Sequence, residues 1–279
     1  PFFINLWIHE PHTPFHVDPK LQKRFAKLEE KDAIYAATLF HADLRIGQLL
    51  DALDRLNLAK DTLVIFSSDN GPARGAPDAP LTLGYDSATG LGYGIAAAKG
   101  ITGGRRAYKG ALLEGGIGVP FIARWPGKIA AGKVDKTSIF SAVDLLPTFC
   151  EIAGVKLPAS YRPDGISQVA TLKGKGTAIR EKPLFWKTVA PWPARKTKPD
   201  HWVSYAVVSK NWKLVTNRDA KYVELYDLVA DPLEKKDLKE KHPAKVTQLK
   251  KMLSQWQGTL PAKPTGNVFS NLRNPKKTK

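Results

Sequence analysis

The feature that most constrains the fold is a strand, helix and strand pattern within the first 68 residues. Residues 2–8 form a short, continuous apolar run, which is typical of a buried strand. Apolar residues then recur every three or four positions between Asp32 and Leu58, which predicts a long amphipathic helix. Residues 62–68 form a second apolar, β-branched run. This order predicts two parallel strands joined by a right-handed crossover, and therefore an α/β fold with a mostly parallel sheet flanked by helices.

Polar residues follow both predicted strands. His9 to His12 come after the first strand, and Asp69 and Asn70 come after the second. Because ligands collect beyond the carboxyl ends of parallel strands, we expect both clusters to face one crevice. The oxygens of Asp69 and Asn70 are hard ligands suited to calcium or magnesium. Taken alone, an Asp-Asn-Gly sequence is more often a plain turn, but its position at a strand end favours a metal site.

Two further side chains can act on an anion. His12 lies between two prolines on a backbone with little freedom, and a fixed imidazole can donate to an anion or serve as a general acid. Lys109 stands beside Gly110, after residues 71–104, which we interpret as a long loop. Its ammonium group can reach an oxyanion as a point charge. The alternatives are an ordinary loop histidine and a solvated basic loop.

After Pro158 the sequence pattern changes to several short strand-like runs followed by one helical run. Strands are predicted at residues 184–189, 202–209 and 212–216, with a hairpin turn at Lys210 and Asn211. A terminal amphipathic helix is predicted to begin at Pro243. We therefore expect a smaller C-terminal α+β antiparallel subdomain. The predicted division is 1–157 for the larger α/β domain, 158–258 for the subdomain and 259–279 for a basic tail; within the larger domain, residues 119–125 are a predicted strand and 144–152 a predicted helix.

Composition narrows the possible partners. The formal charge of +17 suggests a polyanionic partner, such as nucleic acid, an anionic surface or a sulfated polysaccharide, although a solubilising surface is an equal alternative. The single cysteine, Cys150, excludes an internal disulfide and a zinc site built from several thiolates. No stretch approaches the ~18 apolar residues that a membrane span needs.

Several spaced segments together resemble the sulfatase family of the alkaline-phosphatase superfamily. The likeness runs in family order over most of residues 1–256, and several ordered blocks are more specific than any single motif. The sequences HEPHTP and SDNGP, within the first and third of the blocks given below, are most similar to bacterial members of the family that act on polysaccharides. The blocks are FFINLWIHEPHTPF, YAATLFHADLRIGQLLDALDRL, DTLVIFSSDNGP, YKGALLEGGIGVPFIARWPG, SAVDLLPTFCEIAGV and LYDLVADPLEKKDL.

The resemblance implies a role for each candidate residue. Asp69 and Asn70 correspond to two ligands of a divalent ion, usually calcium and less often magnesium. His12 and Lys109 correspond to the histidine and lysine that contact the sulfate and assist departure of the alcohol. As the S–O bond breaks, charge grows on the bridging oxygen, so a proton donor or ammonium group there lowers the barrier.

Two positions depart from the family pattern. The family's nucleophile is a formylglycine made from a cysteine in a C-x-[PA]-x-R context, which Cys150 lacks, so we interpret Cys150 as a packing residue. The nucleophile and the paired acidic ligands are therefore expected in an N-terminal segment that precedes Pro1, and this chain alone is expected not to turn over. Many relatives also carry an arginine where this chain has Gly118, which affects the expected loop geometry.

The sequence thus predicts part of an enzyme that hydrolyses sulfate monoesters, with an alkaline-phosphatase-like fold that is incomplete at its N-terminus. The expected substrate is a sulfated carbohydrate or another sulfate monoester, with no nucleic acid partner, no membrane span and no indication of oligomeric state. The family resemblance implies a periplasmic or secreted location. The alternatives are a phosphodiesterase or phosphonate hydrolase of the same superfamily, and a non-catalytic polyanion-binding protein.

Overall fold

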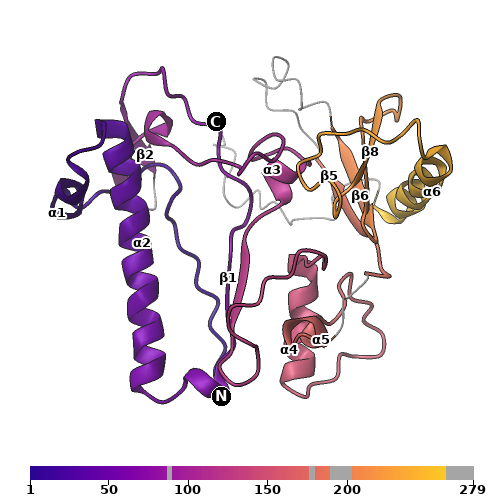
Figure 1. Cartoon of the computed structure of the whole chain (residues 1–279), viewed down its shortest axis with the longest axis horizontal. Coiled ribbons are helices and arrows are strands. Elements are labelled where there is room, and N and C mark those ends of the chain that lie inside the picture. Colours follow the sequence, from indigo (N-terminus) through magenta and orange to yellow (C-terminus); the bar gives the residue numbers. More distant parts are fainter. Residues whose placement is uncertain (87–89, 176–179, 189–202, 262–279) are drawn as a thin grey trace, which may run out of the picture.

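The computed structural model describes residues 1–86, 90–175, 180–188 and 203–261 (Figure 1). All strand pairs among these residues are antiparallel, and they form three sheets. The sheets consist of β1 (Val64–Ser67) with β4 (Phe121–Arg124), β2 (Leu83–Asp86) with β3 (Gly90–Tyr93), and β5 (Leu184–Lys187), β6 (Tyr205–Ser209), β7 (Trp212–Thr216) and β8 (Val223–Asp227) in that order. The helices are α1 (Pro19–Gln22), α2 (Glu30–Arg55), α3 (Glu114–Ile117), α4 (Leu145–Ile152), α5 (Val169–Leu172) and α6 (Pro243–Thr259), with short 3-10 turns at Lys23–Phe25, Ala59–Asp61, Ile95–Ala97 and Ala142–Asp144.

The long helix predicted between Asp32 and Leu58 is confirmed as α2, which stands at the left of Figure 1. Acidic residues in its first turn complement the positive end of the helix dipole. Its N-terminal half packs into a small core in which Ile34 contacts Phe15 and two alanines that follow β3. Its C-terminal half is less covered, and Leu49 remains 37% exposed.

The predicted strand over residues 2–8 is wrong, because these residues form no strand and lie exposed. Phe3 is 72% and Trp7 87% exposed, and the Phe3 ring meets only the edge of Phe149, at 5.7 Å between centroids. A buried strand needs neighbours along its edges and cover on both faces, and no described residues supply these. The predicted parallel pair is consequently not observed; β1 pairs antiparallel with β4 instead.

The stretch predicted as a loop, residues 71–104, contains a hairpin of β2 and β3. Glycines dilute the alternating pattern by which a strand is recognised, and Gly84 lies opposite Gly92 in the pair. Gly92 has no room for a side chain, because a Cβ there would lie 2.6 Å from the carbonyl oxygen of Phe15. Phe15 bridges to Tyr93, so the hairpin fixes the end of the segment that carries His12.

The predicted strand at residues 119–125 is confirmed as β4, and the predicted helix at 144–152 as α4. Asp144 occupies the N-cap position of α4, but its side chain makes no capping hydrogen bond to that helix. It is fully buried and accepts two hydrogen bonds from Nη1 of Arg180, at 2.6 and 2.7 Å. Gly154 ends the helix region with a φ of 66°, a left-handed conformation that glycine adopts without strain.

The C-terminal antiparallel sheet is observed, at the right of Figure 1. The predicted strands correspond to β5, β6 and β7, and the turn at Lys210 and Asn211 joins Ser209 to its partner Trp212. The ends of two of these strand predictions, residues 189 and 202, lie outside the described residues. The fourth strand, β8, was not predicted, because its alternation is broken by acidic residues. The predicted helix at Pro243 is confirmed as α6.

Both faces of the C-terminal sheet are covered by other parts of the chain. One face packs against α6 through Leu249 and Leu253, which are 1% and 4% exposed. The other face packs against Leu112 and Leu113, which precede α3. The sheet therefore joins α6 to the segment that carries Lys109. Fully burying each such leucine stabilises the fold by about 1.5–3 kcal/mol.

The predicted division into 1–157, 158–258 and a tail stays a prediction, and most of that tail, residues 262–279, lies outside the described part. Among the residues that the structure describes, no helix combines the length and apolarity required to cross a membrane.

Candidate functional site

The segment directly after β1 contains Asp69 and Asn70, and we call this segment the tip. Its backbone is held against α3, because the amide of Gly71 donates to the carbonyl oxygen of Gly116 at 2.8 Å. The approach is so close that a Cβ on Gly71 would lie 1.9 Å from the carbonyl oxygen of Gly115. The absence of a side chain at Gly71 therefore permits a close contact between two backbones.

The two side chains of the tip offer a carboxylate and an amide oxygen. Asp69 is exposed, and Asn70 is half-buried. Nδ2 of Asn70 donates to the carbonyl oxygen of Gly71 at 2.9 Å, so Oδ1 is the atom able to bind a cation. This donor set fits calcium, which takes six to eight oxygen ligands, but fills only part of its shell. Within the described ranges, no group of three or more His, Cys, Asp or Glu is arranged to hold a metal ion.

Lys109 lies in the segment of residues 105–117, which we call the clamp loop. Its amide donates to the carbonyl oxygen of Pro72 at 2.9 Å, while its side chain is exposed. The backbone makes the turn through two residues in the left-handed region, Ala107 at φ 66° and Gly110 at φ 87°. The structure thus brings the segment of Lys109 beside the tip, although the two are far apart in the sequence.

His12 lies in a separate segment that leads to α1. Its Nδ1 is 2.6 Å from the carbonyl oxygen of Thr13, and its ring is 5.7 Å from that of His9, centroid to centroid. In the part of the chain that the structure describes, no hydrogen bond, ion pair or ring contact joins His12 to the tip or to Lys109. Three of the four predicted residues are therefore brought together, and His12 is not joined to them.

Two histidines beside His12 were not singled out from the sequence. The ring of His9 is 6.3 Å from that of His16, so His9 lies near both of the other rings. Nε2 of His16 is buried and has no hydrogen-bond partner among the described residues. The spacing of three and four residues between these histidines was the available signal.

Two clusters of charged side chains connect the clamp loop to the C-terminal sheet, and neither cluster was predicted from the sequence. Lys213 in β7 is completely buried and pairs with Glu114 at 2.8 Å and with Glu234 at 2.7 Å. Burial raises the pKa of the Glu234 carboxyl, against the opposing influence of the Lys213 ammonium and the Glu114 amide. The signal in the sequence was a lysine inside an apolar strand, since a buried charge needs a partner.

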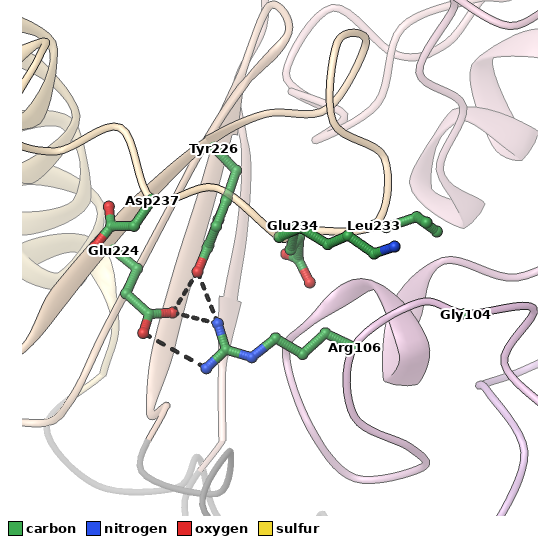
Figure 2. A pocket seen from close by; sticks show the side chains of 8 residues that line it. Gly104, Arg106, Glu224, Tyr226, Leu233, Glu234 and Asp237 are labelled. Carbon is green, nitrogen blue, oxygen red and sulfur yellow. Dashed lines mark hydrogen bonds and ion pairs between the residues drawn. The ribbon is translucent and has the colours of Figure 1, made fainter.

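The second group is centred on Arg106. Its Nη1 donates to Oε2 of Glu224 and to the hydroxyl of Tyr226, both at 2.7 Å (Figure 2). Burial, followed by the hydrogen bond to Glu224, raises the pKa of the Tyr226 hydroxyl. These residues line an open cavity of about 490 Å³ between the clamp loop and β8, which contains none of the four predicted site residues.

The fold is shared with two solved structures of bacterial or related proteins whose chains are about twice as long as this one. A Bacteroides thetaiotaomicron protein, described in connection with the metabolism of multiple glycosaminoglycans, matches with a TM-score of 0.64 and 26% identity over 90% of this chain and 49% of its own. Ps i-CgsB, solved with k-i-k-neocarrahexaose, matches with a TM-score of 0.68 and 23% identity over 96% of this chain and 53% of its own.

The chain belongs to the sulfatase family, which matches residues 1–155; the family of N-sulphoglucosamine sulphohydrolase C-terminal regions matches residues 107–259. It is 28% identical to an N-acetylgalactosamine-6-O-sulfatase of Bacteroides thetaiotaomicron, over 91% of this chain and 46% of that protein. It is 31% identical to human arylsulfatase A, over 67% of this chain and 31% of that protein. The chain therefore spans less than half the length of these two relatives.

Proposed function

We propose that the whole protein to which this chain belongs hydrolyses sulfate monoesters of a sulfated carbohydrate. The observation that carries the proposal is the hydrogen bond from the amide of Lys109 to the carbonyl oxygen of Pro72, at 2.9 Å. It sets a cation and two oxygen ligands on adjoining segments, an arrangement suited to stabilising the negative charge of a sulfate ester as its S–O bond breaks. The names of the relatives, an N-acetylgalactosamine-6-O-sulfatase among them, support a sulfated sugar as the substrate.

In this proposal each residue has one task. Asp69 and Asn70 bind calcium, which when bound neutralises charge on the sulfate oxygens. The ammonium group of Lys109 stabilises the negative charge that develops on the bridging oxygen. His12 supplies a proton to the departing alcohol.

The nucleophile in this proposal is a formylglycine from a segment that precedes Pro1. Cys150 does not fit that role, because it is half-buried on α4 and lacks the arginine of the family's cysteine motif. A polysaccharide does not enter the cytoplasm, so we further propose that the protein acts in the periplasm or outside the cell.

The test measures turnover of an aryl sulfate and an aryl phosphodiester by the whole protein and two variants. Lys109→Ala and His12→Ala are expected to lower kcat for the sulfate by about 10²–10⁴-fold, the range for removal of a catalytic acid or charge. Lys128→Ala, an exposed lysine after β4, is the matched control and is expected to retain turnover. A preference for the phosphodiester would contradict the proposal and favour a phosphodiesterase.

The charge of +17 leaves a polyanion-binding protein as a second explanation, and the same variants test it. Simple electrostatic binding to a heparin-like chain weakens steeply with salt and survives the loss of Lys109 or His12. If the whole protein binds such a chain but cleaves no sulfate ester, the enzymatic proposal fails.

A further inference from the structure

The position of Lys109 is not determined by the clamp loop itself. Between residues 105 and 117 the only regular element is α3, which is four residues long. Two residues in this loop take left-handed φ values, and the Lys109 side chain is exposed. A segment with so little regular secondary structure depends also on its contacts with neighbouring elements.

The first such contact is the buried ion triad of Lys213, Glu114 and Glu234. The side chains of Lys213 and Glu234 are 0% exposed and that of Glu114 is 17% exposed. The second oxygen of Glu234 accepts the backbone amide of Glu114 at 2.7 Å, where α3 begins. One ammonium group of the sheet thus fixes both the side chain and the backbone at the start of α3.

The second contact is Arg106, three positions before Lys109 in the sequence. Its guanidinium group reaches Glu224 and Tyr226 on β8, as Figure 2 shows. The backbone carbonyl oxygen of Arg106 accepts a hydrogen bond from the amide of Gly115 at 2.7 Å, and this bond joins the two ends of the clamp loop. Lys109 therefore lies between two points at which charged side chains bind the loop to the sheet.

The same loop supports the tip. The carbonyl oxygen of Gly116 accepts the amide of Gly71 at 2.8 Å, and Lys109 donates its amide to Pro72. Any side chain on Gly71 would collide with Gly115, so the tip has no room to move closer and loses a hydrogen bond if it moves away. Ion pairs and hydrogen bonds thus connect β7 and β8 to the clamp loop, and hydrogen bonds connect the clamp loop to Gly71 and Pro72, directly after Asp69 and Asn70.

We propose that Lys213, Glu234 and Arg106 are positioning residues, through which the C-terminal sheet aligns Lys109 with the metal ligands of the tip. They do not touch the substrate; they set the distance between the two groups that do. This inference rests on the proposed function, because it assigns a purpose to the alignment. It explains why a charged group, rather than an apolar side chain, occupies the interior of β7.

The test compares Lys213→Met with Arg180→Met in the whole protein. Methionine keeps an unbranched side chain and removes the charge. Arg180 is a matched control, because it also forms a completely buried ion pair, with Asp144, away from the clamp loop. Both variants are assayed below their measured unfolding temperatures, so that loss of folded protein is excluded. The readouts are kcat, KM and the calcium concentration that gives half-maximal turnover.

Lys213→Met is expected to lower kcat by ~10- to 100-fold, the effect of displacing reacting groups by about 1 Å, and to raise the calcium requirement. Arg180→Met is expected to change both by less than about twofold, because it perturbs stability and not alignment. Equal effects of the two variants, or an unchanged kcat in folded Lys213→Met, would overturn the proposal.

A second pair of variants covers the case in which Lys213→Met does not fold. Arg106→Gln removes the half-buried contact to β8, and its control is Arg124→Gln, which removes the exposed pair with Asp54. Only Arg106→Gln is expected to lower kcat and raise the calcium requirement. If Arg106→Gln behaves like its control, the sheet does not align Lys109.

Hydrogen exchange separates failure of this inference from failure of the proposed function. In Arg106→Gln or Lys213→Met, amides of residues 68–73 and 105–117 are expected to exchange faster, whether or not the protein cleaves sulfate esters. If the parent protein has no sulfatase activity but the variants show this faster exchange, the proposed function is wrong, whereas the coupling between the sheet and the tip is supported. Unchanged exchange in both segments would refute the coupling.

Discussion

At the scale of single residues, the contact of Gly71 with α3 gives a direct test of the candidate site. A Cβ at Gly71 would lie 1.9 Å from the carbonyl oxygen of Gly115, so Gly71→Ala must push the tip away from the clamp loop. We expect a loss of about 1–3 kcal/mol in the free energy of unfolding, as for other overpacked sites. Urea unfolding followed by circular dichroism measures it.

The control for that substitution is Gly47→Ala. Gly47 lies within α2, and a Cβ there would have no neighbour within 4 Å. Alanine favours a helix over glycine by about 1 kcal/mol, so this variant is expected to be more stable than the parent. If Gly71→Ala is as stable as the parent, the close backbone contact is not present in solution.

The residues of the candidate site could be predicted to different degrees. Asp69, Asn70 and Lys109 were singled out because polar or charged side chains follow an apolar run or a glycine-rich segment at these positions, and their roles stay predictions. The partners of Lys213 were not found, because pairing with Glu114 joins positions 99 residues apart, which no local pattern encodes. The approach of His12 to the tip was predicted from parallel strands, and that arrangement is not observed.

At the scale of elements, α6 is expected to hold the C-terminal sheet together. Leu249 is 1% exposed and packs on the core residues of β6, β7 and β8. Leu249→Ala should lower the free energy of unfolding by about 2–5 kcal/mol, from lost burial and the cavity left behind. Denaturant unfolding of this variant, monitored by tryptophan fluorescence, provides the measurement.

Gln255→Ala serves as the comparison, because Gln255 is exposed on the same helix. Its effect is expected to stay within about 0.5 kcal/mol of the parent. Similar stabilities for Leu249→Ala and Gln255→Ala would show that α6 does not pack on the sheet as described.

Elements recognised from local periodicity agree with the structure, whereas the two misjudged segments, residues 2–8 and 71–104, depend on contacts that local periodicity does not encode. The amphipathic pattern of α2 is a property of its own residues, and its bounds are within about three positions of the prediction. Residues 2–8 have the composition of a buried strand but lack the partners and cover that would make them one. The β2–β3 hairpin is stabilised by Phe15, which pairs with Tyr93 and is remote in sequence.

At the scale of the whole molecule, the proposed calcium site needs more ligands than the described residues bring together. Asp69 offers two carboxylate oxygens and Asn70 one amide oxygen, whereas calcium takes six to eight oxygen ligands. The described residues contain no cluster of acidic or histidine side chains that could complete this shell. We therefore expect the isolated chain of residues 1–279 to bind calcium with a dissociation constant above about 1 mM.

The whole protein is expected to bind calcium more tightly and to lose turnover when the ion is removed by a chelator. Added calcium should restore turnover in the parent and not in Asp69→Ala, because water replaces a carboxylate that neutralises the ion. Asp78→Ala removes a carboxylate from an exposed position between the tip and β2 and is the matched control. Calorimetric titration of calcium into the whole protein and into the isolated chain measures the two affinities. Tight binding by the isolated chain would mean that the ion is held without ligands from elsewhere.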